Sequence, residues 1–482
     1  MSDFLIPRLK PLLLACSAAG IVLLGGCAVT AVAPPPVAAA PAQFKENNYW
    51  QHATASAPAV PDQWWTVFHD PVLDDLQSKL VIGNENLKTA LTQVAQARAS
   101  LDASRGALWP TLGVGLSATR SASPTGTVID GDPTVRSGPT NSVSLTANAS
   151  WEIDLWGRLS QAASASEARL QASVDDLAAA RLSAQALLAQ TYFSMRTFEA
   201  QQALYERNLT AYDRSLTLTQ ARYDAGVAGR TDVLQAQTQL KTAQAQLADA
   251  VAQRAQLEHA IAVLLGQAPS AFTLARTSVL PETPSVPVLL PSNLLQRRPD
   301  IAAAERRVAA AYAQIGVADA AYFPSLTLAA SAGYRGTGLG DLVSAPNLLW
   351  SIGPTLAQGI FDGGVRKAAS ATARATADQA TSTYRQTVLT ALQEVEDNLS
   401  LAEQLRLSAQ LQREALALAN STLDITNAQY REGTVSYLNV VSAQAAALSS
   451  ELSLLSLRNR ELESVNQLLK NIAGRWQETA TH

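Results

Sequence analysis

The 482-residue sequence contains only two cysteines, four histidines and no basic tract, and its formal net charge is −4. Cys16 falls in an N-terminal segment that we expect to be removed, so no internal disulfide can form in the mature chain. The histidines show no metal-ligand spacing, and no glycine-rich phosphate loop is present. An enzyme, a cofactor and a nucleic-acid partner are therefore all disfavoured.

The N-terminal apolar run, about fourteen residues over 11–24, is too short to cross a bilayer comfortably as a helix. Its basic flank is typical of a signal peptide, which we place at 1–26. The sequence Leu24-Gly25-Gly26-Cys27 has the form of a bacterial lipobox, so we expect a covalent lipid on Cys27 and sorting to the outer membrane. An ordinary signal peptide that happens to contain a cysteine is the alternative. Residues 27–62, rich in proline and alanine, are interpreted as an extended tether.

An internal repeat of about two hundred residues is the strongest positive signal in the chain. Residues 223–237 match residues 430–444 without a gap, and residues 108–112 resemble residues 322–326. We therefore place a first repeat at 63–280, a second repeat with a Pro-rich connector at 281–476, and a short tail at 477–482.

Each repeat is expected to contain a strand pair, at 111–155 and at 325–361, that follows a shorter helix. The strand segments alternate with period two, with apolar residues on one face and small polar residues on the other. This pattern is typical of transmembrane barrel strands, and a soluble sandwich is the alternative. Pro354 must then lie where no ladder hydrogen bond is needed.

Two long helical hairpins are predicted, at 158–265 and at 364–473. Residues 159–224 contain neither proline nor glycine, and their apolar residues recur at heptad spacing. At about 1.5 Å per residue, such a helix is roughly 100 Å long. A soluble bundle core is the alternative, but it does not explain helices of this length.

The strand count predicts an oligomer. Four strands per chain cannot close a barrel, because the smallest barrels have about eight, and strand edges cannot face lipid. Two copies would give eight strands with a filled interior, whereas three copies would give twelve strands and a pore.

Several motifs resemble the TolC-type outer-membrane efflux protein family, and the lipobox makes the chain similar to its OprM/NodT lipoprotein branch. They are Trp64-Trp65 with Asp70-Pro71, Arg298-Pro299-Asp300-Ile301 with Ala304-Glu305, Phe361-Asp362-Gly363-Gly364, and the Tyr-x-x-Gly sequences at Tyr223 and Tyr430. The resemblance implies an α+β membrane protein, a homotrimer. Its 12-stranded β-barrel, four strands per chain, would continue into a 12-helix periplasmic α-barrel of coiled-coil hairpins.

The function that this resemblance implies is the exit duct of a tripartite efflux pump in the cell outer membrane. The duct would passively conduct small molecules such as drugs from an inner-membrane pump of the RND type and a periplasmic adaptor (membrane fusion) protein. A duct for type I protein secretion is the alternative, and the lipid anchor favours efflux.

The resemblance also assigns roles to the two helix turns. It implies adaptor-contact tips at Gly226, Val227, Ala228, Gly229, Gly433, Thr434 and Val435, and a periplasmic gate with Tyr430, Asp232, Asn439 and Tyr223. Asn439 and Ser442 stand where relatives often carry aspartate, which predicts a weakly charged gate. Two alternatives remain: Thr231-Asp232 caps the returning helix, and the two tyrosines simply pack the turns. The glycines themselves suit left-handed helix ends.

Overall fold

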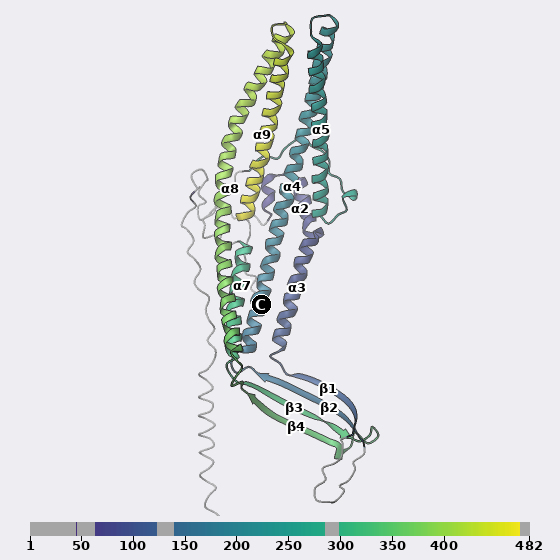
Figure 1. The fold of residues 1–482 in the computed structure, drawn as a ribbon, viewed down its shortest axis with the longest axis vertical. Coiled ribbons are helices and arrows are strands. Elements are labelled where there is room, and N and C mark those ends of the chain that lie inside the picture. Colours follow the sequence, from purple (N-terminus) through teal and green to yellow (C-terminus); the bar gives the residue numbers. More distant parts are fainter. Residues whose placement is uncertain (1–44, 46–62, 123–138, 285–297, 473–482) are drawn as a thin grey trace, which may run out of the picture. The chain divides into compact units, whose positions relative to one another are not determined.

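The computed structural model describes residues 45, 63–122, 139–284 and 298–472 (Figure 1). The expected signal peptide, Cys27, most of the tether and the tail lie outside the described residues. The elements in chain order are η1 (Trp64–Phe68), α2 (Pro71–Gly83), α3 (Glu85–Gly106), β1 (Thr111–Ser121), β2 (Thr140–Ile153), α4 (Arg158–Asp224), α5 (Arg230–Leu264), η2 (Pro269–Ala271), α7 (Pro299–Ala320), β3 (Ser325–Gly336), η3 (Ala345–Asn347), β4 (Leu348–Ala357), α8 (Val365–Arg431) and α9 (Tyr437–Ile472).

The chain forms two compact units, and each takes segments from both repeats. The described part of the first unit comprises Ala95–Ala172 and Ala304–Thr383. The second comprises the described parts of Val37–Val94, Ser173–Ala303 and Tyr384–His482. The two repeats are therefore interleaved within each unit.

The first unit contains a four-stranded antiparallel sheet with the order β1-β2-β3-β4 (Figure 1). The four segments with period-two patterning all form strands, which confirms that prediction. The central pairing joins the two repeats, because β2 pairs with β3 from Val143 opposite Gly336 to Ile153 opposite Leu326. Strands β1 and β4 form the two edges, and Pro354 lies on the β4 edge, where proline is tolerated.

The strand register places the alternating apolar residues of the four strands on one face of the sheet. One row across the four strands is Val114, Ala147, Ala332 and Trp350. The opposite face carries small polar residues, and two serine pairs bridge strands at 2.8 Å: Ser117 with Ser144, and Ser331 with Ser351. These two bridges occupy equivalent positions in the two repeats.

Helices α4 and α8 are each 67 residues long, and in Figure 1 each is followed by a helix that returns beside it. Within the second unit, Leu188 and Met195, which lie seven residues apart on α4, are fully buried. Val174, which lies two heptads before Leu188 on the same helix, is 45% exposed. The seam of α4 is therefore only partly filled by the described residues.

The N-terminal segment packs onto the hairpins of the second unit. Trp64 and Trp65 are buried in the main hydrophobic core, and the Phe68 ring lies 4.7 Å from the Phe193 ring on α4. Asp70 caps α2 as predicted, since its carboxylate accepts hydrogen bonds from the backbone N–H groups of Val72 and Leu73.

The helix expected before the first strand pair is two helices, α2 and α3. They are separated at Asn84, whose side chain accepts a hydrogen bond from the Leu87 N–H and donates one to the Leu264 carbonyl at 2.7 Å. Gly83 also lies against the Leu265 backbone, where a Cβ atom would not fit. The break thus fits the N-terminal helices onto the end of α5.

Candidate functional site: the two hairpin tips

The two helix turns have the same backbone geometry. Gly226 and Gly433 have φ values of +74° and +79°, in the left-handed region that favours glycine. At the first turn the Val227 N–H donates to the Arg222 carbonyl at 2.8 Å, and at the second the Thr434 N–H donates to the Gln429 carbonyl at 3.0 Å. These six-to-one hydrogen bonds define Schellman caps, so the expectation of left-handed glycines at the tips is confirmed.

Tyr430 is the centre of a contact between the two hairpins of one chain. Its side chain is 5% exposed and packs with Tyr437, Val440 and Ala236. The rings of Tyr430 and Tyr437 lie 5.4 Å apart, and the Tyr430 hydroxyl lies 3.4 Å from the Thr219 hydroxyl of α4. The residue therefore ties α8 to α4 rather than only packing its own turn.

Arg222 is a tip residue that sequence reasoning missed. Its guanidinium lies over the Tyr430 ring at 4.8 Å and donates to the Tyr430 carbonyl at 3.0 Å and the Arg431 carbonyl at 3.3 Å. A cation at these carbonyls also stabilises the C-terminal end of α8. The sequence feature that could have identified Arg222 is a difference between the repeats, because its counterpart at position 429 is glutamine.

Tyr437 was missed for a related reason, because its counterpart in the first repeat is Arg230. The Tyr437 side chain is buried, and its hydroxyl lies 3.2 Å from the Ser215 hydroxyl of α4. Burial, with smaller contributions from nearby groups, raises the pKa of Tyr437 above its ordinary value. The phenol therefore stays neutral and available for hydrogen bonding.

The remaining predicted gate residues lie near this cluster but outside it. Asp232 lies in the first turn of α5, whose N-cap is Gly229 with no side-chain cap hydrogen bond, so the capping alternative for Thr231-Asp232 is wrong. Asp232 still places a negative charge near the helix N-terminus, which is favourable. Asn439 is exposed and Tyr223 is 40% exposed.

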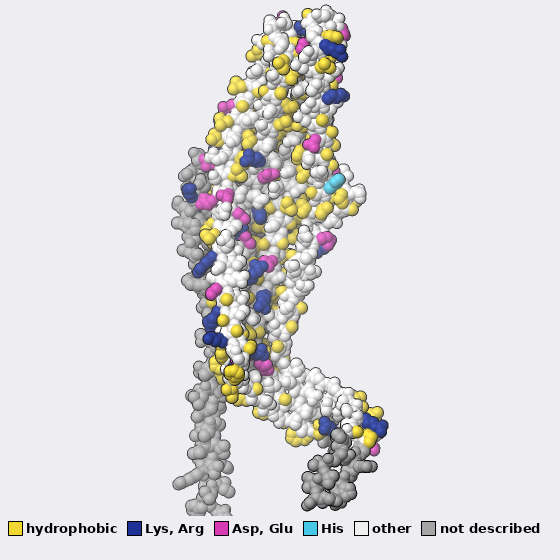
Figure 2. Space-filling model, in the orientation of Figure 1, with side chains coloured by type: hydrophobic (Ala, Val, Ile, Leu, Met, Phe, Trp, Pro, Cys, Tyr) yellow, Lys and Arg dark blue, Asp and Glu magenta, His cyan; other side chains and the backbone are white. Residues whose placement is uncertain are grey.

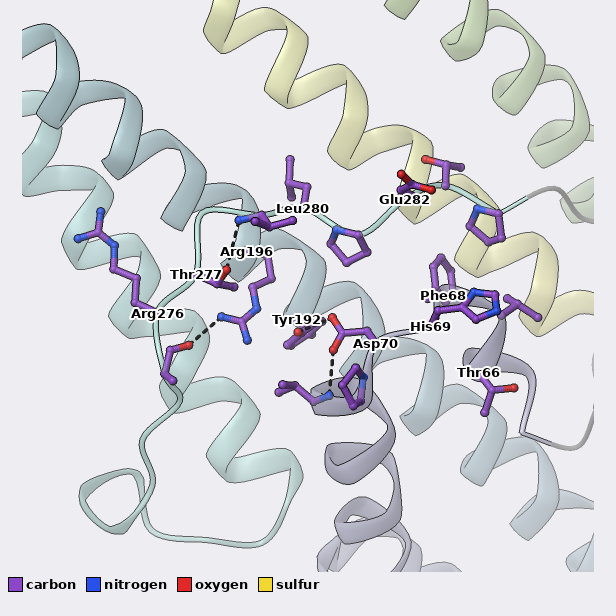
Figure 3. A pocket seen from close by; sticks show the side chains of 18 residues that line it. Thr66, Phe68, His69, Asp70, Tyr192, Arg196, Arg276, Thr277, Leu280 and Glu282 are labelled. Carbon is purple, nitrogen blue, oxygen red and sulfur yellow. Dashed lines mark hydrogen bonds between the residues drawn. The ribbon is translucent and has the colours of Figure 1, made fainter.

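A second notable site is a cavity of ≈ 1090 Å³ between the N-terminal segment, α4 and residues 275–284 (Figure 3). In it, the buried Tyr192 hydroxyl donates to the Asp70 carboxylate at 2.6 Å. Burial and this hydrogen bond raise the pKa of Tyr192 well above its ordinary value. Arg196, one turn further along α4, donates to the Ala275 carbonyl at 2.9 Å.

Buried charges hold the segment of residues 272–280 in place. Glu199 is 0% exposed and accepts hydrogen bonds from Arg196 at 2.6 Å, from Arg254 at 3.1 Å and from the Thr277 N–H at 3.1 Å. Glu258 pairs with Arg254 at 2.6 Å and accepts from the Leu274 N–H. Burial acts to lower the pKa of Arg196, but its interactions with Glu199 and Tyr192 together outweigh this effect and raise the pKa. The network is structural: it pins residues 272–280, the strap, to α4 and α5.

The sheet is apolar on one face, and its two edge strands are free to pair with further strands. Together with two long helical hairpins, these features define a channel protein of the outer-membrane type. The comparisons with known proteins agree. The family model described as "Outer membrane efflux protein" matches residues 76–267 and 290–474. The probable efflux pump outer membrane protein TtgC of Pseudomonas putida is 32% identical over 463 residues, which cover 95% of this chain and 94% of that protein.

Other relatives give the same result. The pyoverdine export outer membrane protein OpmQ of Pseudomonas aeruginosa is 30% identical over 460 residues, which cover 95% of each chain. The solved structure of the outer-membrane channel OprN superposes with a TM-score of 0.85 at 27% identity, covering 93% of this chain and 99% of that one. The chain belongs to the outer membrane efflux protein family. It is a non-enzymatic outer-membrane efflux channel with a periplasmic helical extension.

Proposed function

We propose that three copies of this chain form the exit duct of a tripartite pump, completed by an inner-membrane pump of the RND type and a periplasmic adaptor. The observation that carries the proposal is the four-stranded sheet with one apolar face and two open edges. An edge cannot remain unpaired in lipid, and four strands are half of the smallest barrel. Three copies supply twelve strands around a pore.

Charge placement along the strands supports a lipid-facing apolar side. The strands contain only three charged residues, Arg120, Glu152 and Arg335, and each is the penultimate residue of its strand. Figure 2 shows that charged side chains are sparse over the strands and dispersed over the helices. The uncharged centre of the sheet suits the hydrocarbon core, and the charged ends suit its two interfaces.

The helices also carry an unpartnered seam that a second copy would cover. Leu407, Leu411, Leu418 and Ile425 are exposed on α8 at spacings of four and seven residues. This spacing places them along one stripe of the helix, as in a coiled coil. A neighbouring hairpin in a ring of copies would bury that stripe and continue the wall of the duct.

The cargo that we propose is small molecules such as antibiotics and apolar solvents, conducted passively. The similar proteins are named for antibiotic efflux, toluene efflux and pyoverdine export. These names favour small-molecule efflux over the alternative of protein secretion. The adaptor would bind the tips at Gly226, Val227, Ala228 and Gly229 and at Gly433, Thr434 and Val435.

We also propose that a lipid on Cys27 attaches the chain to the membrane, in addition to the barrel. One acyl chain alone holds a protein only marginally on a membrane, so the barrel and the lipid would act together. Mass spectrometry of the mature N-terminus tests this point, because an unmodified Cys27 or an uncleaved signal peptide would contradict it.

Two neighbouring residues of β4 provide a matched test of the duct. Ile352 lies on the apolar face and is 65% exposed in the single chain, whereas Ser351 lies on the polar face. Arginine on the lipid side of a barrel costs about 2–4 kcal/mol near the midplane, whereas lumen positions tolerate it. We expect Ile352→Arg to reduce membrane-inserted protein and drug resistance, while Ser351→Arg retains both. Native mass measurement in detergent should give three chains, and equal insertion of both variants, or a detergent-free monomer, would contradict the proposal.

A further inference from the structure

Residues from both repeats form the contacts between the two tips of one chain, and their counterparts in the other repeat do not form the equivalent contacts. Tyr430 and Tyr223 are 207 positions apart, as are both ends of α8 and α4. The in-chain contact joins Tyr430 to Thr219, and the counterparts of these two residues are Tyr223 and Thr426. Tyr430 is buried, but Tyr223 is 40% exposed and Thr426 is half-buried. Hence one chain contains both residues of an equivalent contact, Tyr223 and Thr426, but does not form that contact itself.

A ring of copies would bring these two residues together. Head-to-tail assembly places the second hairpin of one copy beside the first hairpin of the next. We propose that Tyr223 of a second copy docks on the flank of α8 formed by Thr426 and Gln429, as Tyr430 docks on Thr219 and Arg222 within one chain. This inference rests on the proposed assembly of copies into a ring. It assigns Tyr223 an interface role at the seam between copies.

The two contacts differ in the residues that hold them closed. Within a chain, Arg222 covers the Tyr430 ring and donates to two carbonyls of the neighbouring hairpin, and Tyr437 packs against the same ring. At the seam, Gln429 stands at the position of Arg222, and Arg230 stands at the position of Tyr437. Glutamine supplies neither the cation–π contact nor the charge-assisted hydrogen bonds. The residues that clamp the in-chain contact are therefore not repeated at the seam.

Thiol crosslinking of the full-length protein tests the docking. Tyr223→Cys with Thr426→Cys, treated with a short bifunctional thiol reagent, should give covalent dimers and trimers on a denaturing gel. The matched pair Tyr430→Cys with Thr219→Cys should link within the chain and migrate as a monomer. Only monomers from the first pair, in preparations whose native mass still shows three chains, would overturn the inference and leave the proposed duct standing. Preparations without trimers would instead contradict the duct.

A gain of the clamp at the seam tests whether the seam contact helps to hold the tip closed. Gln429→Arg recreates the in-chain residue at its counterpart, and Glu432→Gln makes the same change in net charge at an exposed position of the same tip. In planar bilayers we expect Gln429→Arg to lower channel opening by roughly threefold to tenfold for each seam, and Glu432→Gln to open as the wild type does. Equal behaviour of the two variants would overturn the inference.

Discussion

Replacing Glu199 by glutamine tests whether buried charge holds the strap of residues 272–280 in place. Glu199 is fully buried, and its oxygens accept from Arg196, Arg254 and the Thr277 N–H. Glutamine keeps the shape and one acceptor oxygen but removes the negative charge. Arg196, which is 3% exposed, is then left without its carboxylate partner.

The size of the effect follows from this burial. Removing one partner of a buried ion pair costs about 3–5 kcal/mol. We expect about 3 kcal/mol, the lower end of that range, because glutamine still accepts one hydrogen bond and Arg254 retains Glu258. Since about 1.4 kcal/mol is a factor of ten, local opening of the strap should become roughly 100-fold more frequent.

Hydrogen exchange of the detergent-purified protein, measured by mass spectrometry, reports this opening. The informative amides are Leu274 and Thr277, which donate to Glu258 and Glu199. Glu206→Gln is the matched control, because Glu206 pairs with Arg276 of the same strap at an exposed position, where a pair contributes about 1 kcal/mol or less. If Glu199→Gln accelerates exchange no more than Glu206→Gln, the buried network does not hold the strap.

Three further outcomes are expected. Gly433→Leu should abolish drug resistance while trimers persist, because φ is +79° and a side chain there would approach Arg222; resistance and trimer assays check this. Tyr430→Phe combined with Asp232→Ala should raise single-channel conductance and sensitise cells to large antibiotics, although the Tyr430–Thr219 hydrogen bond that it removes contributes only ~1 kcal/mol. Wild-type conductance from intact trimers would place the gate elsewhere. Asn439→Asp should raise cation selectivity, measured from reversal potentials, because it adds a ring of negative charge.

Periodicity made most of the fold predictable. The strands and the hairpins follow from patterns of period two and seven, and the left-handed turns follow from Gly226 and Gly433. The register between β2 and β3 did not follow, because it joins residues almost two hundred positions apart. Nor did the division between α2 and α3, which depends on the contact of Asn84 with the end of α5.

The tips were predictable only in part for the same reason. The positions of the turns are local properties of the sequence, whereas the Arg222–Tyr430 contact joins residues that are distant in the chain. Local helix-start rules also suggested a cap at Thr231-Asp232. The N-cap of α5 is instead Gly229, and no side chain makes a capping hydrogen bond there. Positions where the two repeats differ, such as Arg222 and Gln429, were the informative ones.

The equal lengths of α4 and α8, 67 residues each, restrict how the protein can change in size during evolution. Inserting one residue into a helix with about 3.6 residues per turn rotates everything beyond it by about 100°. Seven inserted residues bring the apolar seam back to within about 20°, and they lengthen the helix by about 10 Å. The same insertion must also occur in the returning helix and in the other hairpin. The reach of such a channel across the periplasm can therefore grow only in coordinated heptad steps, which makes its length a slowly evolving property.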